Sequence, residues 1–264
     1  ETEAGFEEVV SIELQDLSDE ELQEIAAKEW STVEVIRDDG STRWGYYWLP
    51  FSPTEMELYG RLPREPGPAH VAIQIGHWKN DEVPEELEGL TQNDRGAQGR
   101  GYTELQTVTV IAHLVKEKLE AEGFRVDLLP TTIPIDYYAD AFISIHADGN
   151  NNPTVRGFKM AAPRFDYSGQ STVLVEKLTN AYQERTGLPI DDNITRRMSG
   201  YYAFNWRRYE HALHPLTPAA IVETGFMTSP NDRDVIVNNP DLAAEAIAVG
   251  LKDFCCEQTE KTLL

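Results

Sequence analysis

Several features are scarce in this 264-residue sequence, and each scarcity argues against a class of protein. Its only cysteines are the adjacent pair Cys255-Cys256, which we interpret as small apolar residues of a helix rather than as a redox or metal site. No apolar run approaches the ~18–20 residues that span a bilayer, so we predict no membrane-spanning segment. Basic residues are few, 23 against 45 acidic ones, which argues against non-specific binding to nucleic-acid phosphates.

The beginning of the chain is acidic, with 14 Asp or Glu against two basic residues in positions 1–40. Ser18 and Glu21 have the spacing of a capping box, which predicts a helix that reaches to about Trp30. Two β-rich runs follow, over residues 32–37 and 42–49, and the Asp39-Gly40 step between them is a strong hairpin signal.

Prolines and glycines interrupt any periodic structure over residues 60–68, where we place a linker. The sequence therefore predicts three parts. Residues 1–66 form a small helix–hairpin appendage, residues 67–258 form the main domain, and residues 259–264 are a C-terminal tail. The chain begins at Glu1 without a signal peptide, so we expect a processed product whose targeting segment has been removed.

Three apolar runs in the main domain end in residues that bind metals or transfer protons. The run VAIQI precedes Gly76-His77, AFISIH ends in His146, and AAIVE ends in Glu223. Such runs are typical of strands, and in open α/β sheets the carboxyl ends of the strands hold ligands. A single histidine here could simply end a strand, but three such ends together favour a metal or catalytic site over packing.

Glu104 opens a helical pattern whose apolar positions include Val108, Ile111 and Val115 and which closes at Gly123. A carboxylate in a first helical turn is also favoured by the helix dipole, so Glu104 taken alone has an ordinary explanation.

Taken in chain order, His77, Glu104, His146 and Glu223 lie in motifs. These motifs resemble those of the zinc-dependent N-acetylmuramoyl-L-alanine amidases of bacterial cell-wall lysis. The matching motifs are Gly76-His77, Glu104, Ser144-Ile145-His146 and Glu223-Thr224-Gly225-Phe226, within residues 70–254, together with Asp94-Arg95-Gly96-Ala97. The chain departs from the family at Trp78-Lys79, where a glycine run is usual, and at Asp148, where Asn is usual.

The resemblance implies a single α/β catalytic domain with a twisted, mixed, largely parallel sheet and helices on both faces. It implies one Zn²⁺ per chain, held by His77, Glu104 and His146 with water in the fourth position. Glu223 would be the general base and acid. The substrate would be peptidoglycan, cleaved at the amide between N-acetylmuramic acid and L-alanine, by an enzyme acting outside the cytoplasm (secreted, periplasmic or wall-associated).

Two other functions stay open on the residues alone. A zinc carboxypeptidase uses the same ligand types, and it would need an arginine for the terminal carboxylate, for which Arg196-Arg197 and Arg207-Arg208 are candidates. A wall-binding module without catalysis would be expected to lack a ligand or Glu223, and neither is missing.

The remaining candidates have alternative interpretations. Trp78 is either a substrate platform or a roof over the metal, and Asp148 either orients a histidine or ends a strand. We expect His113 at the edge of the core, and His211 and His214 at the surface or behind the site. A strand is predicted over residues 156–162, helices over 171–186 and 201–212, and a final helix from Pro240 to about Cys256.

Overall fold

The computed structural model describes residues 31–36, 42–47, 68–91 and 96–262, with side chains for residues 68–91 and 96–257. The chain divides into two compact units, Glu1–Pro63 and Arg64–Leu264. In the first unit, β1 (Ser31–Ile36) pairs antiparallel with β2 (Thr42–Tyr47), and Ser31 lies opposite Tyr47. This pairing confirms the predicted hairpin. The predicted helix near Ser18 and the linker lie outside the described residues, and the domain boundaries stay predictions.

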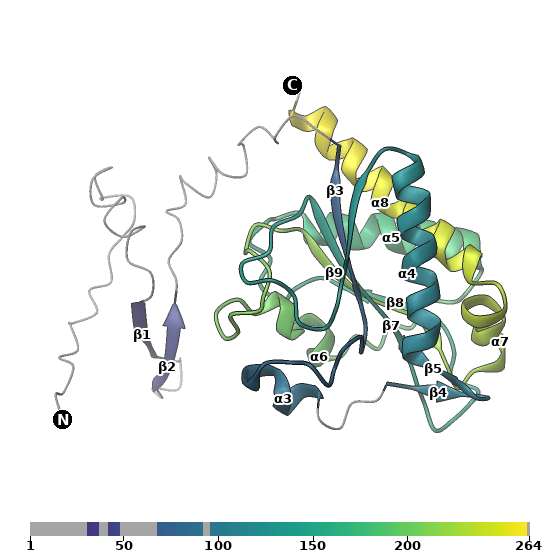
Figure 1. Ribbon diagram of the computed structural model, residues 1–264, viewed down its shortest axis with the longest axis horizontal. Coiled ribbons are helices and arrows are strands. Elements are labelled where there is room, and N and C mark those ends of the chain that lie inside the picture. Colours follow the sequence, from purple (N-terminus) through teal and green to yellow (C-terminus); the bar gives the residue numbers. More distant parts are fainter. Residues whose placement is uncertain (1–30, 37–41, 48–67, 92–95, 263–264) are drawn as a thin grey trace. The chain divides into compact units, whose positions relative to one another are not determined.

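The second unit is built on one five-stranded sheet with the strand order β6-β3-β7-β9-β8. Figure 1 shows this sheet together with the helices of the same unit. Four strands are parallel, and β8 runs antiparallel to β9 at one edge. The mixed, largely parallel sheet predicted for this chain is therefore confirmed. In spatial order the strands are β6 (Arg125–Leu129), β3 (His70–Ile75), β7 (Ala141–Asp148), β9 (Ala219–Phe226) and β8 (Lys159–Ala161).

Helices cover both faces of this sheet, because successive residues of its strands point to opposite sides. Val71, Ile73 and Ile75 face a core that includes α4 (Glu104–Ala121), α5 (Ser171–Thr186) and α8 (Pro240–Thr262). On the other face, Ala72 and Phe142 pack against α3 (Glu85–Thr91) and η2 (Tyr202–Phe204). The shorter elements are β4 (Gln98–Gly99), β5 (Tyr102–Thr103), α6 (Arg196–Ser199), α7 (Pro230–Arg233) and the π-helical η3 (Asp234–Asn238).

Helix ends follow their local signals. Helix α5 begins at Ser171 and ends at Thr186, as predicted, because Gly187 adopts the left-handed conformation with φ of 65°. Helix α8 runs past Cys256 to Thr262 and is longer than predicted. Among the helices that the structure describes, none combines the length and apolarity needed to cross a bilayer.

Two element predictions were wrong in extent. The strand expected over residues 156–162 is reduced to the three residues of β8. Residues 201–212 do not form a helix: after η2 the chain folds back, and the Leu213 N–H donates to the Ala203 carbonyl, 2.8 Å away. That carbonyl would accept from residue 207 in a continuous helix. The spacing of the buried aromatic residues in this segment is also typical of a helix, which explains the wrong prediction.

Candidate metal centre

Backbone geometry places two histidines and a carboxylate at the carboxyl edge of the sheet. Strand β3 ends at Ile75, and the next N–H, from Gly76, donates to the Ile145 carbonyl of β7 at 3.0 Å. His77 follows in a turn with φ of 64°, and His146 lies in β7 itself.

Glu104 is fixed by the start of α4. The Thr103 side chain accepts a hydrogen bond from the Gln106 N–H, and the Gln106 side chain accepts one from the Thr103 N–H. This capping box holds the first turn, so the Glu104 side chain leaves a rigid helix end. Glu104 is only 4% exposed, which is unusual for a carboxylate that merely complements a helix dipole.

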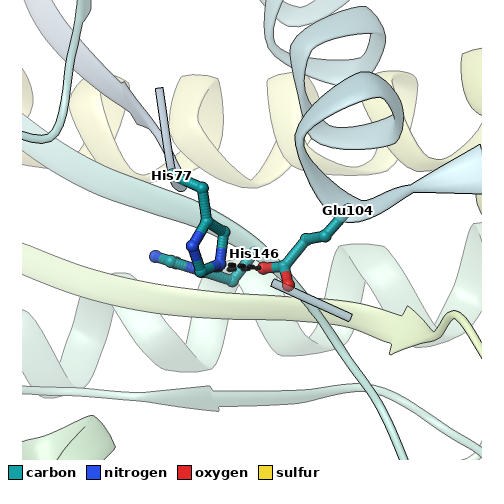
Figure 2. A group of neighbouring side chains, drawn as sticks. All are labelled: His77, Glu104 and His146. Atoms are coloured by element: carbon teal, nitrogen blue, oxygen red, sulfur yellow. Dashed lines mark hydrogen bonds and ion pairs between the residues drawn. The ribbon is translucent and has the colours of Figure 1, made fainter. Parts of the chain in front are cut away.

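Both imidazole rings approach the same oxygen of the Glu104 carboxylate (Figure 2). Glu104 Oε1 lies 3.0 Å from His77 Nε2 and 3.0 Å from His146 Nδ1. The two imidazole rings are 5.1 Å apart and nearly perpendicular, at 83°. One donor atom from each residue lies within 4.8 Å of the other two, which is compact enough for all three to reach a single ion.

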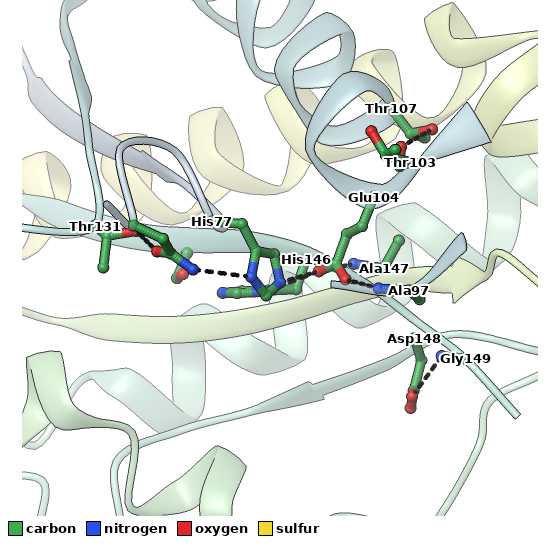
Figure 3. Close-up of polar contacts among 12 residues, drawn as sticks. His77, Ala97, Thr103, Glu104, Thr107, Thr131, His146, Ala147, Asp148 and Gly149 are labelled. Carbon is green, nitrogen blue, oxygen red and sulfur yellow. Dashed lines mark hydrogen bonds and ion pairs between the residues drawn. The ribbon is translucent and has the colours of Figure 1, made fainter. Parts of the chain in front are cut away.

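Backbone donors complete the surroundings of the Glu104 carboxylate (Figure 3). Its Oε2 accepts from the Ala97 N–H at 2.7 Å, and Oε1 also accepts from the Ala147 N–H at 3.1 Å. Burial by itself would raise the pKa of this carboxyl, but hydrogen bonds from His146 and His77, with their charges, hold the pKa well below its usual range. Glu104 is therefore an anion, as a metal ligand must be.

Two glycines leave room for these side chains. A Cβ on Gly76 would lie 2.6 Å from His146 Nδ1, and a Cβ on Gly96 would lie 2.7 Å from Glu104 Oε2. Gly96 also has a φ of +69°, which side chains rarely adopt. Of the Asp94-Arg95-Gly96-Ala97 motif, Gly96 and Ala97 thus contribute to the centre, while Asp94 and Arg95 lie outside the described residues.

Each histidine has a second polar partner on its other nitrogen. Asn80 Nδ2 lies 3.3 Å from His77 Nδ1, and Asn80 Oδ1 accepts from the Thr131 hydroxyl at 2.6 Å. Because an amide offers both a donor and an acceptor, Asn80 can pair with either tautomer of His77. The Tyr201 hydroxyl lies 3.3 Å from His146 Nε2. Sequence reasoning missed these partners, and only the short spacing from His77 to Asn80 offered a local signal.

Glu223 lies on the same row of the sheet as His146. Strand pairing sets Glu223 beside His146 in β7 and beside Lys159 in β8. Directly paired residues share one face of a sheet, so the three side chains emerge on the same side. Glu223 is half-buried. The group of potential ligands found among the described residues contains His77, Glu104 and His146 but not Glu223.

Lys159 brings a buried positive charge to this row. It is 4% exposed, and its Nζ lies 2.7 Å from Asp148 Oδ2 and 2.9 Å from Asp191 Oδ2. Burial lowers the pKa of Lys159, but hydrogen bonds to Asp148 and Asp191 outweigh it and raise the pKa above its usual value. Asp148 therefore pairs with a lysine, a role that neither sequence interpretation of Asp148 had included.

The other candidates lie in different surroundings. His211 Nδ1 is 2.8 Å from Glu86 Oε1, and His214 is half-buried with its ring edge against Tyr138, 5.5 Å away. Burial lowers the pKa of His214. Trp78 is partly buried against the main core. His113 is exposed on α4, so its predicted place at the core edge was wrong; its position falls on the solvent side of the helix.

Comparisons with known proteins identify a family and a shared fold. The family model of N-acetylmuramoyl-L-alanine amidase matches residues 71–253. Similar solved structures include the N-acetylmuramyl-L-alanine amidase Ami1 from Mycobacterium smegmatis, at 22% identity over 72% of this chain and 97% of that one, with a TM-score of 0.53. Ami1 from Mycobacterium abscessus is 19% identical over 70% and 98%, with a TM-score of 0.53.

An N-acetylmuramoyl-L-alanine amidase from Clostridium difficile 630 is also similar, at 19% identity over 71% of this chain and 97% of that one, with a TM-score of 0.50. At these identities the three structures show a shared fold. No curated protein sequence matches the chain.

Proposed function

The chain belongs to the N-acetylmuramoyl-L-alanine amidase family, which hydrolyses peptidoglycan, and we propose that it works with one Zn²⁺ held by His77, Glu104 and His146. The observation that carries this proposal is the convergence of both imidazoles on Glu104 Oε1, each at 3.0 Å. The family assignment supplies the scissile bond, the amide between N-acetylmuramic acid and L-alanine.

The donor atoms suit zinc better than the hard cations. Two imidazole nitrogens and one carboxylate oxygen make a common catalytic zinc set, and three protein ligands leave one position open. Mg²⁺ and Ca²⁺ prefer oxygen ligands throughout. When bound, the ion lowers the pKa of a coordinated water and polarises the carbonyl of the scissile amide.

Glu223 is our candidate for proton transfer. Its neighbour on the sheet row is His146, so its carboxylate emerges beside the proposed metal ligands without belonging to their group. A carboxylate in that place can accept a proton from the attacking water and return it to the amine of the departing L-alanine. Lys159 of β8, which is paired with Glu223 of β9, adds a positive charge to the same row of the sheet.

The variant Glu223→Gln tests whether Glu223 transfers the proton rather than binds the metal ion. It keeps the shape of the side chain but cannot accept the proton. We expect turnover of purified peptidoglycan to fall ~10²–10⁴-fold, as is typical for a positioned proton shuttle, while zinc content stays the same. Glu184→Gln, at an exposed position on α5, is the matched control and should not change turnover. Near-normal turnover of Glu223→Gln would exclude Glu223 from the mechanism, and loss of zinc would make it a ligand.

The same reaction mixture separates the two alternatives. An amidase releases stem peptides that begin with a free L-alanine amino group. A carboxypeptidase shortens stem peptides from the other end, and a binding module releases nothing. Of the arginines considered for carboxylate binding, Arg207 is stacked over Tyr167 at 4.9 Å and Arg208 over Tyr209 at 5.2 Å. We expect the amidase products.

Peptidoglycan lies outside the cytoplasmic membrane, and on that ground we propose an extracytoplasmic location, whether secreted, periplasmic or wall-associated. Fractionation of cells that produce the protein, followed by detection with an antibody, tests this location. Recovery with the cytoplasmic fraction alone would contradict it.

A further inference from the structure

A fully buried glutamine lies in the middle of the central strand β3. Gln74 is 0% exposed, within a run of otherwise apolar residues, and a buried amide is costly unless all its groups are hydrogen-bonded. Its Nε2 donates to the Thr131 carbonyl at 3.0 Å and to the Pro130 carbonyl at 3.3 Å. Backbone carbonyls only accept, so the amide cannot be reversed, and Oε1 must point the other way.

Two hydroxyl groups meet that oxygen. Ser144 Oγ and the Tyr201 hydroxyl each lie 2.8 Å from Gln74 Oε1 and donate to it. Tyr201 has one hydroxyl proton, and the contact with Gln74 is shorter than the 3.3 Å contact with His146 Nε2. With its proton directed to Gln74, the phenolic oxygen presents a lone pair to His146.

The consequence is a defined tautomer of His146. A lone pair facing Nε2 favours a proton on Nε2, so when a metal ion takes the place of the proton that Nδ1 donates to Glu104, the neutral imidazole binds that ion through Nδ1. Nδ1 is the nitrogen that lies 3.0 Å from Glu104 Oε1, inside the candidate metal centre. The Tyr201 ring also stands edge-on to the imidazole, with centroids 5.7 Å apart at 82°, which restricts rotation of His146.

We propose that Gln74 and Tyr201 are positioning residues that hold His146 in the tautomer and orientation that bind a metal ion through Nδ1. Two backbone carbonyls orient the Gln74 amide, the amide oxygen orients the Tyr201 hydroxyl, and the hydroxyl orients His146. This inference rests on the proposed function, because it takes His146 as a ligand. It adds two residues that the sequence motifs do not contain.

The neighbouring residue provides a matched control. Tyr202 belongs to the same network: its hydroxyl lies 2.7 Å from Gln74 Nε2 and also donates to the Thr131 carbonyl. It contacts the donor end of the Gln74 amide, which the carbonyls of Pro130 and Thr131 still anchor if the Tyr202 hydroxyl is lost. Tyr202 also forms a side-chain hydrogen bond with Tyr201. Tyr201→Phe and Tyr202→Phe therefore each remove one hydroxyl from the network, but only the Tyr201 hydroxyl contacts His146.

The experiment measures the zinc dissociation constant of the full chain by competition with a chromophoric chelator, for wild type, Tyr201→Phe, Tyr202→Phe and His146→Ala. We expect Tyr201→Phe to weaken zinc binding ~10–100-fold, as is typical for loss of a partner behind a ligand. Tyr202→Phe should retain the wild-type affinity for zinc. Its loss of thermal stability should be similar to that of Tyr201→Phe. The absorption bands of the Co²⁺-substituted protein should shift in Tyr201→Phe and not in Tyr202→Phe.

A double variant tests the order of control. Gln74→Met removes the amide at similar volume and lets the Tyr201 proton turn toward His146, so it should also weaken zinc binding. Because both residues act through one hydrogen bond, the double variant with Tyr201→Phe should bind zinc no more weakly than the weaker single variant. Additive losses would overturn the relay.

Equal zinc affinities in Tyr201→Phe and Tyr202→Phe would overturn the positioning role, provided that His146→Ala has lost zinc. If His146→Ala keeps wild-type affinity, the ligand set of the proposed function is itself wrong. The two failures are therefore distinguishable.

Discussion

Strand β3 starts at His70, and His77 follows its other end, so one strand positions an imidazole at each edge of the sheet. Both histidines face a carboxylate: His70 Nε2 lies 2.9 Å from Asp127 Oδ2, and His77 Nε2 lies 3.0 Å from Glu104 Oε1. The surroundings differ. The Asp127 side chain is 44% exposed, whereas the Glu104 side chain is 5% exposed.

The further partners separate the two ends. At the amino edge, Arg125 Nη2 lies 2.5 Å from His70 Nδ1, and the Tyr137 hydroxyl lies 2.5 Å from Asp127 Oδ2. A guanidinium beside the ring repels a cation and only donates, so this cluster is complete without a metal. At the carboxyl edge, a second imidazole takes the place of the arginine. A histidine at a strand end therefore indicates a metal centre only when another donor converges on the same carboxylate.

Metal removal should have the largest effect and should act at one end only. Dialysis against a chelator should abolish turnover, and zinc should restore it, since the proposed chemistry needs the ion. Zinc at about 1,000 times its dissociation constant should stabilise the wild type by about 4 kcal/mol. Thermal unfolding of His77→Gln should show no such gain, whereas His70→Gln should show the full gain. A loss of the zinc response in His70→Gln would show that the amino edge of the sheet also contributes to zinc binding.

Gly96→Ala should damage the carboxyl edge without removing a ligand. The new Cβ would meet Glu104 Oε2 at 2.7 Å, and such overpacking costs about 1–3 kcal/mol. Zinc affinity should fall, as a chelator competition assay would show. Gly123→Ala is the control, because Gly123 also has positive φ, +86°, but its Cβ would meet open space. Equal zinc affinities in the two variants would show that space at Gly96 does not matter.

The amino edge should instead respond to acid. Burial raises the pKa of Asp127, but hydrogen bonds from Tyr137 and His70 outweigh it, so the folded-state pKa lies below the ordinary value of 3.8. The stabilising contribution is then fully present above that value and is lost as pH falls through the folded-state pKa. Asp127→Asn should remove this part of the acid sensitivity, at a cost of at most about 1 kcal/mol near neutral pH, because the pair is partly exposed.

Urea unfolding between pH 3 and pH 7 measures this effect, with Asp81→Asn at an exposed position as the control. Zinc affinity at neutral pH should be unchanged in both variants. If Asp127→Asn has the wild-type pH dependence, the Asp127 cluster does not contribute to stability as its contacts indicate.

Deletion of residues 1–66 should have the smallest effect on either edge. We predict a folded, zinc-loaded domain with wild-type zinc affinity and altered affinity for peptidoglycan. Circular dichroism, metal analysis and a peptidoglycan pull-down check the three parts of this prediction. A truncated chain that cannot fold would show that these residues belong to the core of the main domain.

Local patterns predicted much of the fold. Strand β3 ends before Gly76-His77 as predicted, and the start of α4 and the extent of α5 depend on caps and glycine, which act over a few residues. The predicted ends of the other two strands were wrong, because β7 continues to Asp148 and β9 continues to Phe226. The segment 201–212 was predicted wrongly because its course depends on distant contacts. The motifs also brought His77, Glu104 and His146 into view as a set, and the structure does place them together.

The supporting residues of the centre could not be predicted in this way. Tyr201 lies 55 residues from His146 and 127 from Gln74 along the chain, and nothing near it in sequence indicates those contacts. Gln74 stands in an apolar strand, where a single polar residue has no local explanation. Lys159 contacts Asp191 across 32 residues. Such contacts are properties of the assembled sheet.

The central claim is that His77, Glu104 and His146 hold one metal ion while His70 holds none. The most direct test is the metal content of the purified proteins after zinc loading and dialysis, measured by mass spectrometry of the element. We predict about one zinc per chain in the wild type and in His70→Ala. We predict almost none in His77→Ala, Glu104→Ala and His146→Ala. Full zinc content in any of these three variants, or its loss in His70→Ala with the fold intact, would contradict the account.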